Sequence, residues 1–302
     1  NHAKNIFENT RHEGTIKETG QDVVLACEKP IEAVGYPVRN FEDVDIELDL
    51  EYDFNFLTMA QWGPRKNIYN TIKWFVEENI DQEVGLVVKT SVRRGNVIDR
   101  HHTEKRITEL LEKYKDRKCK VYLLHGDMSA EELNSIYKHP KIKAYVSLSH
   151  GEGFGLPLYE AAYNGIPIIT SGWSGQCDFL YAPFEHKSGK KKNNKLHPYF
   201  AEVEYNLQPV QPESHWEGVI EKDSMWCYPQ EGSYKMRLRQ VRKNYKKWEK
   251  KAAYLQKWIL ETFTEEKQNK KFMDFVLEDI EIVTDTEVDD MFNKLFAGGD
   301  PS

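Results

Sequence analysis

One glycine-rich stretch contains two glutamates. Glu152 lies within the turn Gly151–Gly155, and Glu160 follows it with seven residues in between. The apolar run 144–148 before the turn reads as a buried strand, and Pro157 after it suits the first position of a helix. A strand, a glycine turn and a helix start present backbone N–H groups to an anion at the carboxyl edge of an α/β sheet. The stretch therefore predicts an anion-binding site, although each glutamate taken alone would be an ordinary surface carboxylate.

A second group of polar residues, Gln61 to Asn67, follows the apolar run 54–60. Pro64 again marks a helix start, so Arg65 and Lys66 are expected in a first helical turn at the same edge of the sheet. Two cations there would complement a diphosphate. Near such a site, Glu160 could accept from the two hydroxyls of a ribose, and Glu152 could hold a sugar hydroxyl or stabilise positive charge at an anomeric carbon.

The elements that must position these side chains alternate along the chain. Apolar runs predict strands, and amphipathic stretches predict helices. Their alternation along the chain predicts an α/β fold with a Rossmann-like parallel sheet covered by helices on both faces. The expected strands are 54–60, 84–89, 121–125 and 142–148, and the expected helices are 64–78, 103–114 and 130–138.

Three further patterns predict local structure on either side of this region. Alternation of apolar and acidic residues over 45–54 predicts a strand with a solvated acidic face. Apolar residues three and four apart predict one long helix from Ser233 to about Ile259. Thr262 and Glu265 have the spacing of a capping box for a last helix.

Composition excludes some classes of protein and favours others. The chain of 302 residues carries a net charge of −7, which argues against nucleic acid as a partner. The four cysteines form no CxxC pair, so reduced thiols in a cytoplasmic protein are expected. No apolar run has the length of a membrane span. The stretch 235–257 holds ten Lys and Arg residues, for which a solvated helix face is the first interpretation and contact with a membrane surface the second.

The stretch from Glu152 to Glu160 resembles the E-x7-E signature of the retaining glycosyltransferases of family 4, which have the GT-B fold. The Gln61–Asn67 segment resembles their phosphate motif, in which Lys66 falls on the family's lysine. The passage 123–137 resembles the strand and helix that precede the signature. Collinear resemblance covers about 54–181, and more loosely the helices to about 280.

This resemblance implies transfer of a sugar from a nucleotide donor to an acceptor with retention at the anomeric carbon. It implies no metal and no cofactor, the nucleotide-diphosphate sugar being a substrate. Glu152 would contact the donor sugar as the catalytic residue, and Glu160 the nucleotide ribose. The remaining donor-binding residues would be Gln61, Arg65, Lys66, Gly153, Phe154, Gly155 and Leu156. The acceptor, whether glycan, lipid or protein, is not implied.

Two departures from the family pattern bear on this interpretation. Gln61 stands where the family has an arginine, so Arg65 is expected to supply the missing charge. Only some 50 residues precede the match, whereas the family has an N-terminal Rossmann-like domain that binds acceptor. We therefore expect the donor-binding half of a larger enzyme, whose N-terminal domain is largely missing. The expected divisions are 1–50 as its remnant and linker, 51–230 as the nucleotide-sugar domain, 231–280 as C-terminal helices, and 281–302 as an acidic, flexible tail.

Two alternatives stay open from the sequence. A non-catalytic domain that binds or scaffolds a nucleotide sugar would be consistent with Gln61 and the missing half. A GT-B nucleotide-sugar epimerase is the other, and the E-x7-E signature argues against it.

Overall fold

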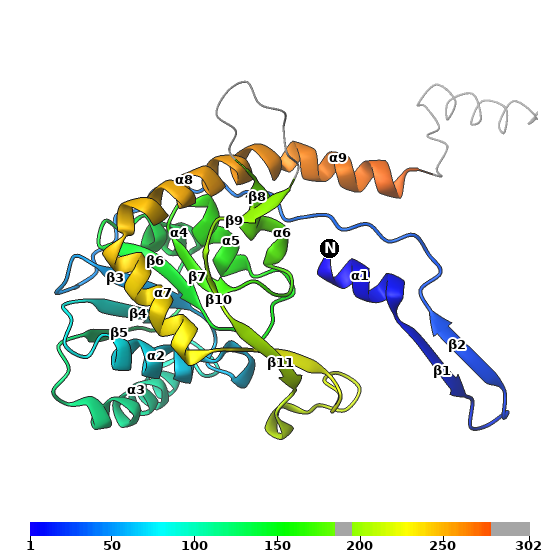
Figure 1. Cartoon of the computed structure of the whole chain (residues 1–302), viewed down its shortest axis with the longest axis horizontal. Coiled ribbons are helices and arrows are strands. Elements are labelled where there is room, and N and C mark those ends of the chain that lie inside the picture. Colours follow the sequence, from blue (N-terminus) through cyan, green and yellow to red (C-terminus); the bar gives the residue numbers. More distant parts are fainter. Residues whose placement is uncertain (185–194, 279–302) are drawn as a thin grey trace, which may run out of the picture.

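The computed structural model describes residues 1–184 and 195–278, and its centre is a six-stranded parallel sheet. The strand order is β10-β7-β6-β3-β4-β5, and every neighbouring pair is parallel (Figure 1). The strands are β3 (Asn55–Met59), β4 (Gly85–Lys89), β5 (Lys120–Leu124), β6 (Ile142–Ser147), β7 (Ile168–Ser171) and β10 (Ala201–Val203). The expected α/β fold with a parallel sheet is therefore confirmed.

Helices cover both faces of this sheet, as expected. On one face, α4 (Ala130–Lys138), α5 (Leu156–Tyr163) and α8 (Tyr245–Thr262) contribute to one apolar core. On the other face, α2 (Ile68–Glu78), α3 (Val97–Leu111) and α7 (Glu231–Lys243) contribute to a second. Neighbouring residues of one strand, such as Phe56 and Leu57, enter different cores, which explains why the strands read as continuous apolar runs.

The predicted single helix from Ser233 to Ile259 is wrong, because the helix breaks at Asn244 between α7 and α8. Asn244 has φ −120° and ψ 39°, outside the helical region. The break lets α7 pack against α2 on one side of the sheet while α8 packs against α5 on the other. The last helix, α9 (Glu265–Val276), is capped by the Thr264 side chain, not by Thr262.

The strand expected over 45–54 is also absent. Ile46 and Leu48 do pack against the first core and Leu50 is buried, so one side of the segment faces inward as the alternation indicated. The segment nevertheless forms no ladder with any strand of the described residues. Alternation reports one-sided burial, which an extended segment packed on a core also satisfies without strand partners.

Several short elements lie outside the central sheet. Helix α1 (His2–Asn9) and the hairpin β1 (Arg11–Thr15) and β2 (Asp22–Ala26) bury no residue and project from the body in Figure 1. The hairpin of β8 (Tyr181–Pro183) with β9 (Leu196–Pro198) and that of β11 (Tyr205–Pro209) with β12 (Met225–Pro229) are antiparallel. Single turns of 3-10 helix are η1 (Pro64–Lys66), η2 (Glu112–Tyr114), η3 (Pro212–Ser214), and a one-turn α-helix is α6 (Cys177–Leu180). The expected acidic tail, 281–302, lies outside the described residues.

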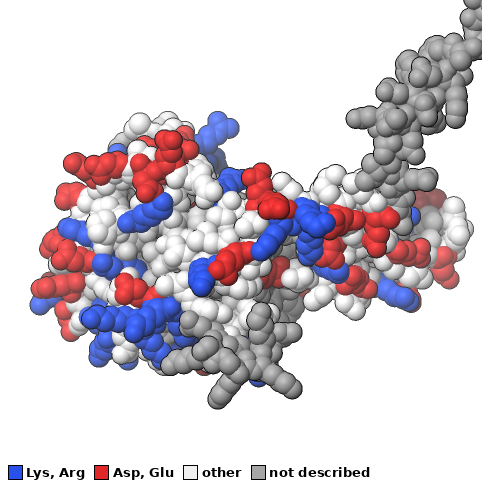
Figure 2. Space-filling view, turned by 90° about the horizontal axis from the view of Figure 1, so that it is seen from above, with Lys and Arg blue, Asp and Glu red and all other residues white. Residues whose placement is uncertain are grey.

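The basic stretch 235–257 forms much of α7 and α8, and several of its cations contact other parts of the protein. Lys235 pairs with Glu77 at 2.7 Å, and Arg239 pairs with Glu78 at 2.8 Å. Arg237, Arg242 and Lys251 also contact the protein. Figure 2 shows basic and acidic side chains interspersed on the face that includes α8 and α9. These contacts favour the first interpretation, a solvated face that also holds the helices in place.

Candidate functional site

The cationic turn lies directly after β3, at the carboxyl edge of the sheet. Pro64 begins η1, so Arg65 and Lys66 occupy the one helical turn that precedes α2. Asn67 then takes a left-handed conformation with φ 52°, which turns the chain into α2. Its side-chain amide donates to the carbonyl of Leu148 at 3.3 Å, and this bond ties the turn to the end of β6.

The glycine turn lies after β6, beside the cationic turn. Gly155 has φ 90° at the cap of α5, a conformation that favours glycine. The helix begins at Leu156, with Pro157 second rather than first. A Cβ on Gly175 would lie 1.9 Å from the carbonyl oxygen of Gly153, so the loop after β7 fits against the turn only because position 175 has no side chain.

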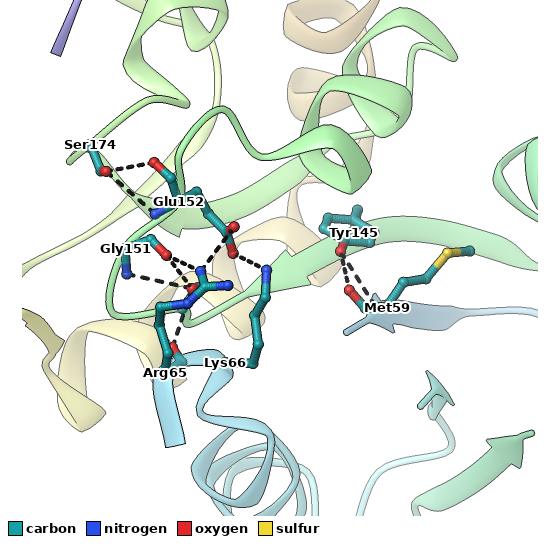
Figure 3. A network of polar contacts seen from close by, with 8 residues as sticks. Met59, Arg65, Lys66, Tyr145, Gly151, Glu152 and Ser174 are labelled. Atoms are coloured by element: carbon teal, nitrogen blue, oxygen red, sulfur yellow. Dashed lines mark hydrogen bonds and ion pairs between the residues drawn. The ribbon is translucent and has the colours of Figure 1, made fainter. Parts of the chain in front are cut away.

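Glu152 joins the two turns. Its carboxylate accepts from Lys66 Nζ at 2.6 Å and from Arg65 Nη1 at 3.2 Å. Figure 3 shows both cationic side chains pointing from η1 toward the glycine turn. Arg65 also donates to the carbonyl of Gly151. The Glu152 side chain is 10% exposed and that of Lys66 21%, so the Lys66–Glu152 pair is partly shielded from water.

Two serines fix the backbone of this loop. Ser174 donates from Oγ to the carbonyl of Glu152 at 2.7 Å and accepts from its amide at 3.3 Å (Figure 3). Ser174 itself has φ 74°, which places its short side chain against the loop. Ser149 Oγ lies 3.2 Å from the carbonyl oxygen of Arg65 and 3.0 Å from that of Gly151. The position of Glu152 is thus set by three loops, those after β3, β6 and β7.

Glu160 lies in a different environment on α5. Its carboxylate accepts from the hydroxyl of Tyr137 at 3.0 Å, and burial raises the pKa of Glu160 although that hydrogen bond opposes the shift. In the described residues no hydrogen bond or ion pair joins Glu160 to Lys66 or Glu152. Both carboxylates lie close enough to the buried Tyr145 to act on it. Burial raises the pKa of the Tyr145 hydroxyl most, and the charges of Glu152 and Glu160 raise it further.

Two buried tyrosines, Tyr137 and Tyr145, pack against each other near Glu160. The Tyr145 hydroxyl donates to the carbonyl of Met59 at 3.1 Å (Figure 3), and the two tyrosine rings lie 5.9 Å apart. Sequence reasoning missed both residues. They stand at apolar positions of a helix and a strand. Only the tertiary structure shows that the Tyr137 hydroxyl reaches Glu160 and that the Tyr145 hydroxyl bonds to Met59.

The other residues expected to bind donor are distributed around the turn. Gly153 is exposed and a Cβ added there would meet nothing within 4 Å, and Leu156 is 42% exposed. Phe154 packs on Tyr36 and Phe179. Gln61 is not brought into the group around Glu152: its amide donates to the carbonyl of Val92 at 3.1 Å, in the loop after β4.

His150 has a structural role at the start of the glycine loop. The ring is 5% exposed, stacks on Trp226, and its Nδ1 lies 2.7 Å from the carbonyl oxygen of Cys227. Burial lowers the pKa of His150, so the neutral ring with a protonated Nδ1 donates this bond. The ring therefore anchors the start of the glycine loop to β12.

Three absences apply to the described part of the chain. No group of three or more His, Cys, Asp or Glu side chains within residues 1–184 and 195–278 could hold a metal ion. Over the same residues, no helix is both long and apolar enough to cross a bilayer. The four cysteines, all of them described, form no disulfide.

A glycine turn and a cationic first turn at the carboxyl edge of a parallel sheet are typical of a class of α/β domains that bind phosphate-bearing ligands. Residues 42–185 match the family described as "Glycosyl transferases group 1". The chain therefore contains a glycosyl transferase group 1 domain of glycosyltransferase family 4. The family match and the parallel sheet together confirm the expected fold, that of the C-terminal half of a GT-B enzyme.

Several solved structures are similar to this chain at low sequence identity. A glycosyltransferase from Rickettsia africae ESF-5 is 11% identical with a TM-score of 0.50, over 74% of this chain and 47% of that one. Anabaena HepE in complex with UDP-glucose is 13% identical with a TM-score of 0.47, over 74% of this chain and 49% of that one. The C-terminal domain of LpcC from Francisella tularensis is 13% identical with a TM-score of 0.44, over 70% of this chain and 87% of that one.

The chain spans about half the length of the larger proteins among these matches. At this level of identity the likeness concerns the fold alone. No curated protein sequence matches the chain significantly.

Proposed function

We propose that this chain binds the nucleotide-diphosphate sugar donor of a retaining, metal-independent glycosyltransferase, and that it supplies the donor half of the active site. The observation that carries the proposal is the meeting of Lys66 and Arg65 with Glu152, across 86 and 87 residues of sequence. The sequence singled out these three residues separately, on chemical grounds and by resemblance. Their convergence at one sheet edge supports a shared ligand.

The diphosphate would bind between the two turns. Lys66 and Arg65 supply the positive charge, and the backbone of Gly153, Phe154, Gly155 and Leu156 supplies the positive end of α5. A diphosphate that binds there has to compete with the Glu152 carboxylate for Lys66. Once the cations turn to phosphate, Glu152 is released toward the sugar, where its negative charge can stabilise an oxocarbenium-like transition state.

The ribose would be held by Glu160. One of its oxygens already accepts from Tyr137, which fixes the carboxylate and leaves further acceptor capacity for the ribose hydroxyls. Ionised Glu160 is disfavoured by its burial, and two new donors would compensate that cost in the complex. Glu160 is therefore assigned to binding and Glu152 to the transfer step.

A second function, a domain that binds the donor without transferring sugar, draws support from Gln61. The family's arginine is replaced, and the Gln61 amide is engaged with Val92 rather than with the two turns. Arg65, which is 43% exposed on its side chain, is the residue that could take over the missing charge. The epimerase alternative gains no support from any contact in the site.

The experiment that tests the proposal is a titration of the chain with UDP, GDP, ADP and their hexose conjugates, with magnesium and with EDTA. We expect saturable binding of one nucleotide that is the same under both conditions and that is lost in Glu160→Ala. Binding that requires magnesium, or binding that survives Glu160→Ala unchanged, would overturn the site assignment. Transfer activity with the bound donor separates the enzyme from the binding-only domain.

A further inference from the structure

A lysine to which the proposed function gives no role lies at the carboxyl edge of the sheet. Lys89 is the last residue of β4 and lies opposite Met59 of β3. Val88 belongs to the second core and Val87 to the first, so the alternation of side chains along the strand places Lys89 on the first face. That face is covered by α4 and α5, so Lys89 lies on the same side of the sheet as the helix that carries Glu160.

The ammonium group of Lys89 is half-buried and contacts a neutral partner. Its Nζ donates to the carbonyl of Gly126, in the loop after β5. Burial lowers the pKa of Lys89, and the negative charge of Asp127 opposes this shift. A lysine ammonium has several N–H donors, and a bond to one carbonyl leaves donors for a ligand.

Asp127 provides an acceptor close to this donor. It directly follows Gly126, and its carboxylate lies against the loop after β4, because a Cβ on Gly95 would be 2.6 Å from Asp127 Oδ1. The absence of a side chain at position 95 therefore leaves room for the carboxylate. Asp127 is exposed, so its remaining acceptor sites face solvent or a ligand. The loop after β5 thus brings a cationic donor and an anionic acceptor together.

The two groups lie where the base of the proposed donor would reach. The diphosphate is assigned to Lys66 after β3, and the ribose to Glu160 on α5. Tyr137 of α4 bonds to Glu160, and the loop that contains Asp127 leads directly into α4. Lys89 is at the end of β4, the neighbour of β3 on the side away from β6. A base attached to that ribose would therefore meet Lys89 and the loop after β5.

We propose that Lys89 and Asp127 recognise the base of the donor and select an oxo base over an amino base. Uracil and guanine present a carbonyl oxygen beside a ring N–H, an acceptor next to a donor. An ammonium close to a carboxylate is the complementary pair. Cytosine and adenine present an amino group beside an unprotonated ring nitrogen, so Lys89 would face a donor and Asp127 an acceptor. The proposal rests on the proposed function and makes it more specific, since it names the class of the base.

Two pairs of nucleotides isolate this difference. UDP and CDP differ by an oxo or an amino group at C4 of the ring, and IDP and ADP differ in the same way at C6. The unaltered chain, Lys89→Met and Lys141→Met are titrated with all four nucleotides. Lys141→Met is the matched control, because Lys141 also donates to a backbone carbonyl, that of Leu50 at 2.7 Å, but directly before β6 at the opposite edge of the sheet.

In whichever pair fits the site, the oxo nucleotide should bind about tenfold or more tightly than its amino partner, since a charge-assisted hydrogen bond is gained. Lys89→Met should bring this ratio close to one, and Lys141→Met should leave it unchanged. Asp127→Asn, at an exposed position where folding is not at risk, should also lower the ratio, because an amide can donate as well as accept.

Three results would overturn the proposal: equal affinities within each pair, tighter binding of the amino nucleotide, or an oxo preference that both Lys89→Met and Asp127→Asn retain. The last result would mean that Lys89 only ties β4 to the loop after β5. If nucleotides bind in a way that depends on Glu160 but each pair is bound equally, the base assignment fails alone. If none of the four nucleotides binds, the donor site fails and the base assignment fails with it.

Discussion

Lys66 Nζ lies 2.6 Å from Glu152 Oε1, so the residue proposed to bind the diphosphate is paired with the residue proposed to act on the sugar. One ion pair thus connects the two ends of the donor. A ligand phosphate that displaces the carboxylate from Lys66 also sets the carboxylate free. This coupling makes the individual roles of the two residues measurable.

Lys66→Met should weaken nucleoside diphosphate binding by about ten- to a hundredfold, since a charge-assisted hydrogen bond of about 1.5–3 kcal/mol is lost. Isothermal titration with the nucleotide selected from the panel measures the change. Lys105→Met is the control, because Lys105 is an exposed cation of α3 that pairs with Glu109 at the surface. Equal effects of the two substitutions would mean that Lys66 acts only through the general field of the protein.

Glu152→Gln should strengthen binding of the nucleoside diphosphate by up to about fivefold, because a partly shielded competitor for Lys66 becomes neutral. The same variant should lose sugar transfer. The two effects have opposite signs, which a damaged fold cannot produce. A fall in nucleotide affinity would show that Glu152 holds the phosphate site together instead of competing for it.

Glu160→Gln should stabilise the protein at neutral pH. Burial raises the pKa of Glu160 in the folded chain above its usual 4.5. Between 4.5 and that raised pKa the folded state binds more protons than the unfolded state, so the free energy of unfolding falls as pH rises, and the loss persists above the window. Melting temperatures of Glu160→Gln and the unaltered chain should therefore agree near pH 4 and diverge toward pH 7. Glu109→Gln, at an exposed position of α3, should follow the unaltered chain.

The same Glu160→Gln protein should bind the nucleotide at least about tenfold more weakly, since hydrogen bonds to a charged acceptor are worth about 1.5–3 kcal/mol. If Glu160→Gln gains stability and loses nucleotide binding, then Glu160 contributes to ligand binding at a cost to the stability of the fold. Deoxynucleotides provide the check, because a ligand with one hydroxyl fewer should lose less affinity in the variant. An equal loss for ribose and deoxyribose would place Glu160 away from the sugar of the nucleotide.

Two glycine substitutions separate folding from binding at the turn. Gly153→Ala meets no atom within 4 Å, so its melting temperature should stay unchanged while donor affinity falls if phosphate approaches that backbone. Gly175→Ala would place a Cβ 1.9 Å from the carbonyl oxygen of Gly153, so the protein should lose stability as well as binding. Gly232→Ala in α7, which also meets nothing, is the control. Full donor affinity in Gly153→Ala would remove that backbone from the site.

Much of the fold could be predicted because its sheet is parallel and covered on both faces. That arrangement makes each strand a continuous apolar run, and the alternation of runs with amphipathic helices determines the architecture. The predicted secondary structure was wrong in two places, where the same sequence pattern can arise from two different structures. The residues around 46–50 alternate because one side of an extended segment is buried, and Asn244 interrupts a helix whose apolar spacing continues through the break.

The candidate site could be predicted only in part, and the division has a physical basis. Glu152, Lys66 and the glycine turn carry a local signal, since loops that follow parallel strands meet at one edge whatever else the chain does. Tyr137 and Tyr145 carry no such signal, because a tyrosine at an apolar position looks the same whether its hydroxyl meets an acid or a carbonyl. Gln61 was expected in the phosphate group by position, but a side chain that can reach two loops takes its orientation from the tertiary structure.

The backbone of His150 is bonded on both sides, donating to Arg65 and accepting from the Cys227 amide at 3.0 Å. We therefore expect the cationic turn, the glycine loop and β12 to open together. In hydrogen exchange they should form one cooperative unit, with the amides of His150 and Cys227 exchanging at similar rates. A donor that engages only the two turns would then slow exchange in a hairpin it never touches, and by the same linkage a change in that hairpin would alter how long the donor stays bound.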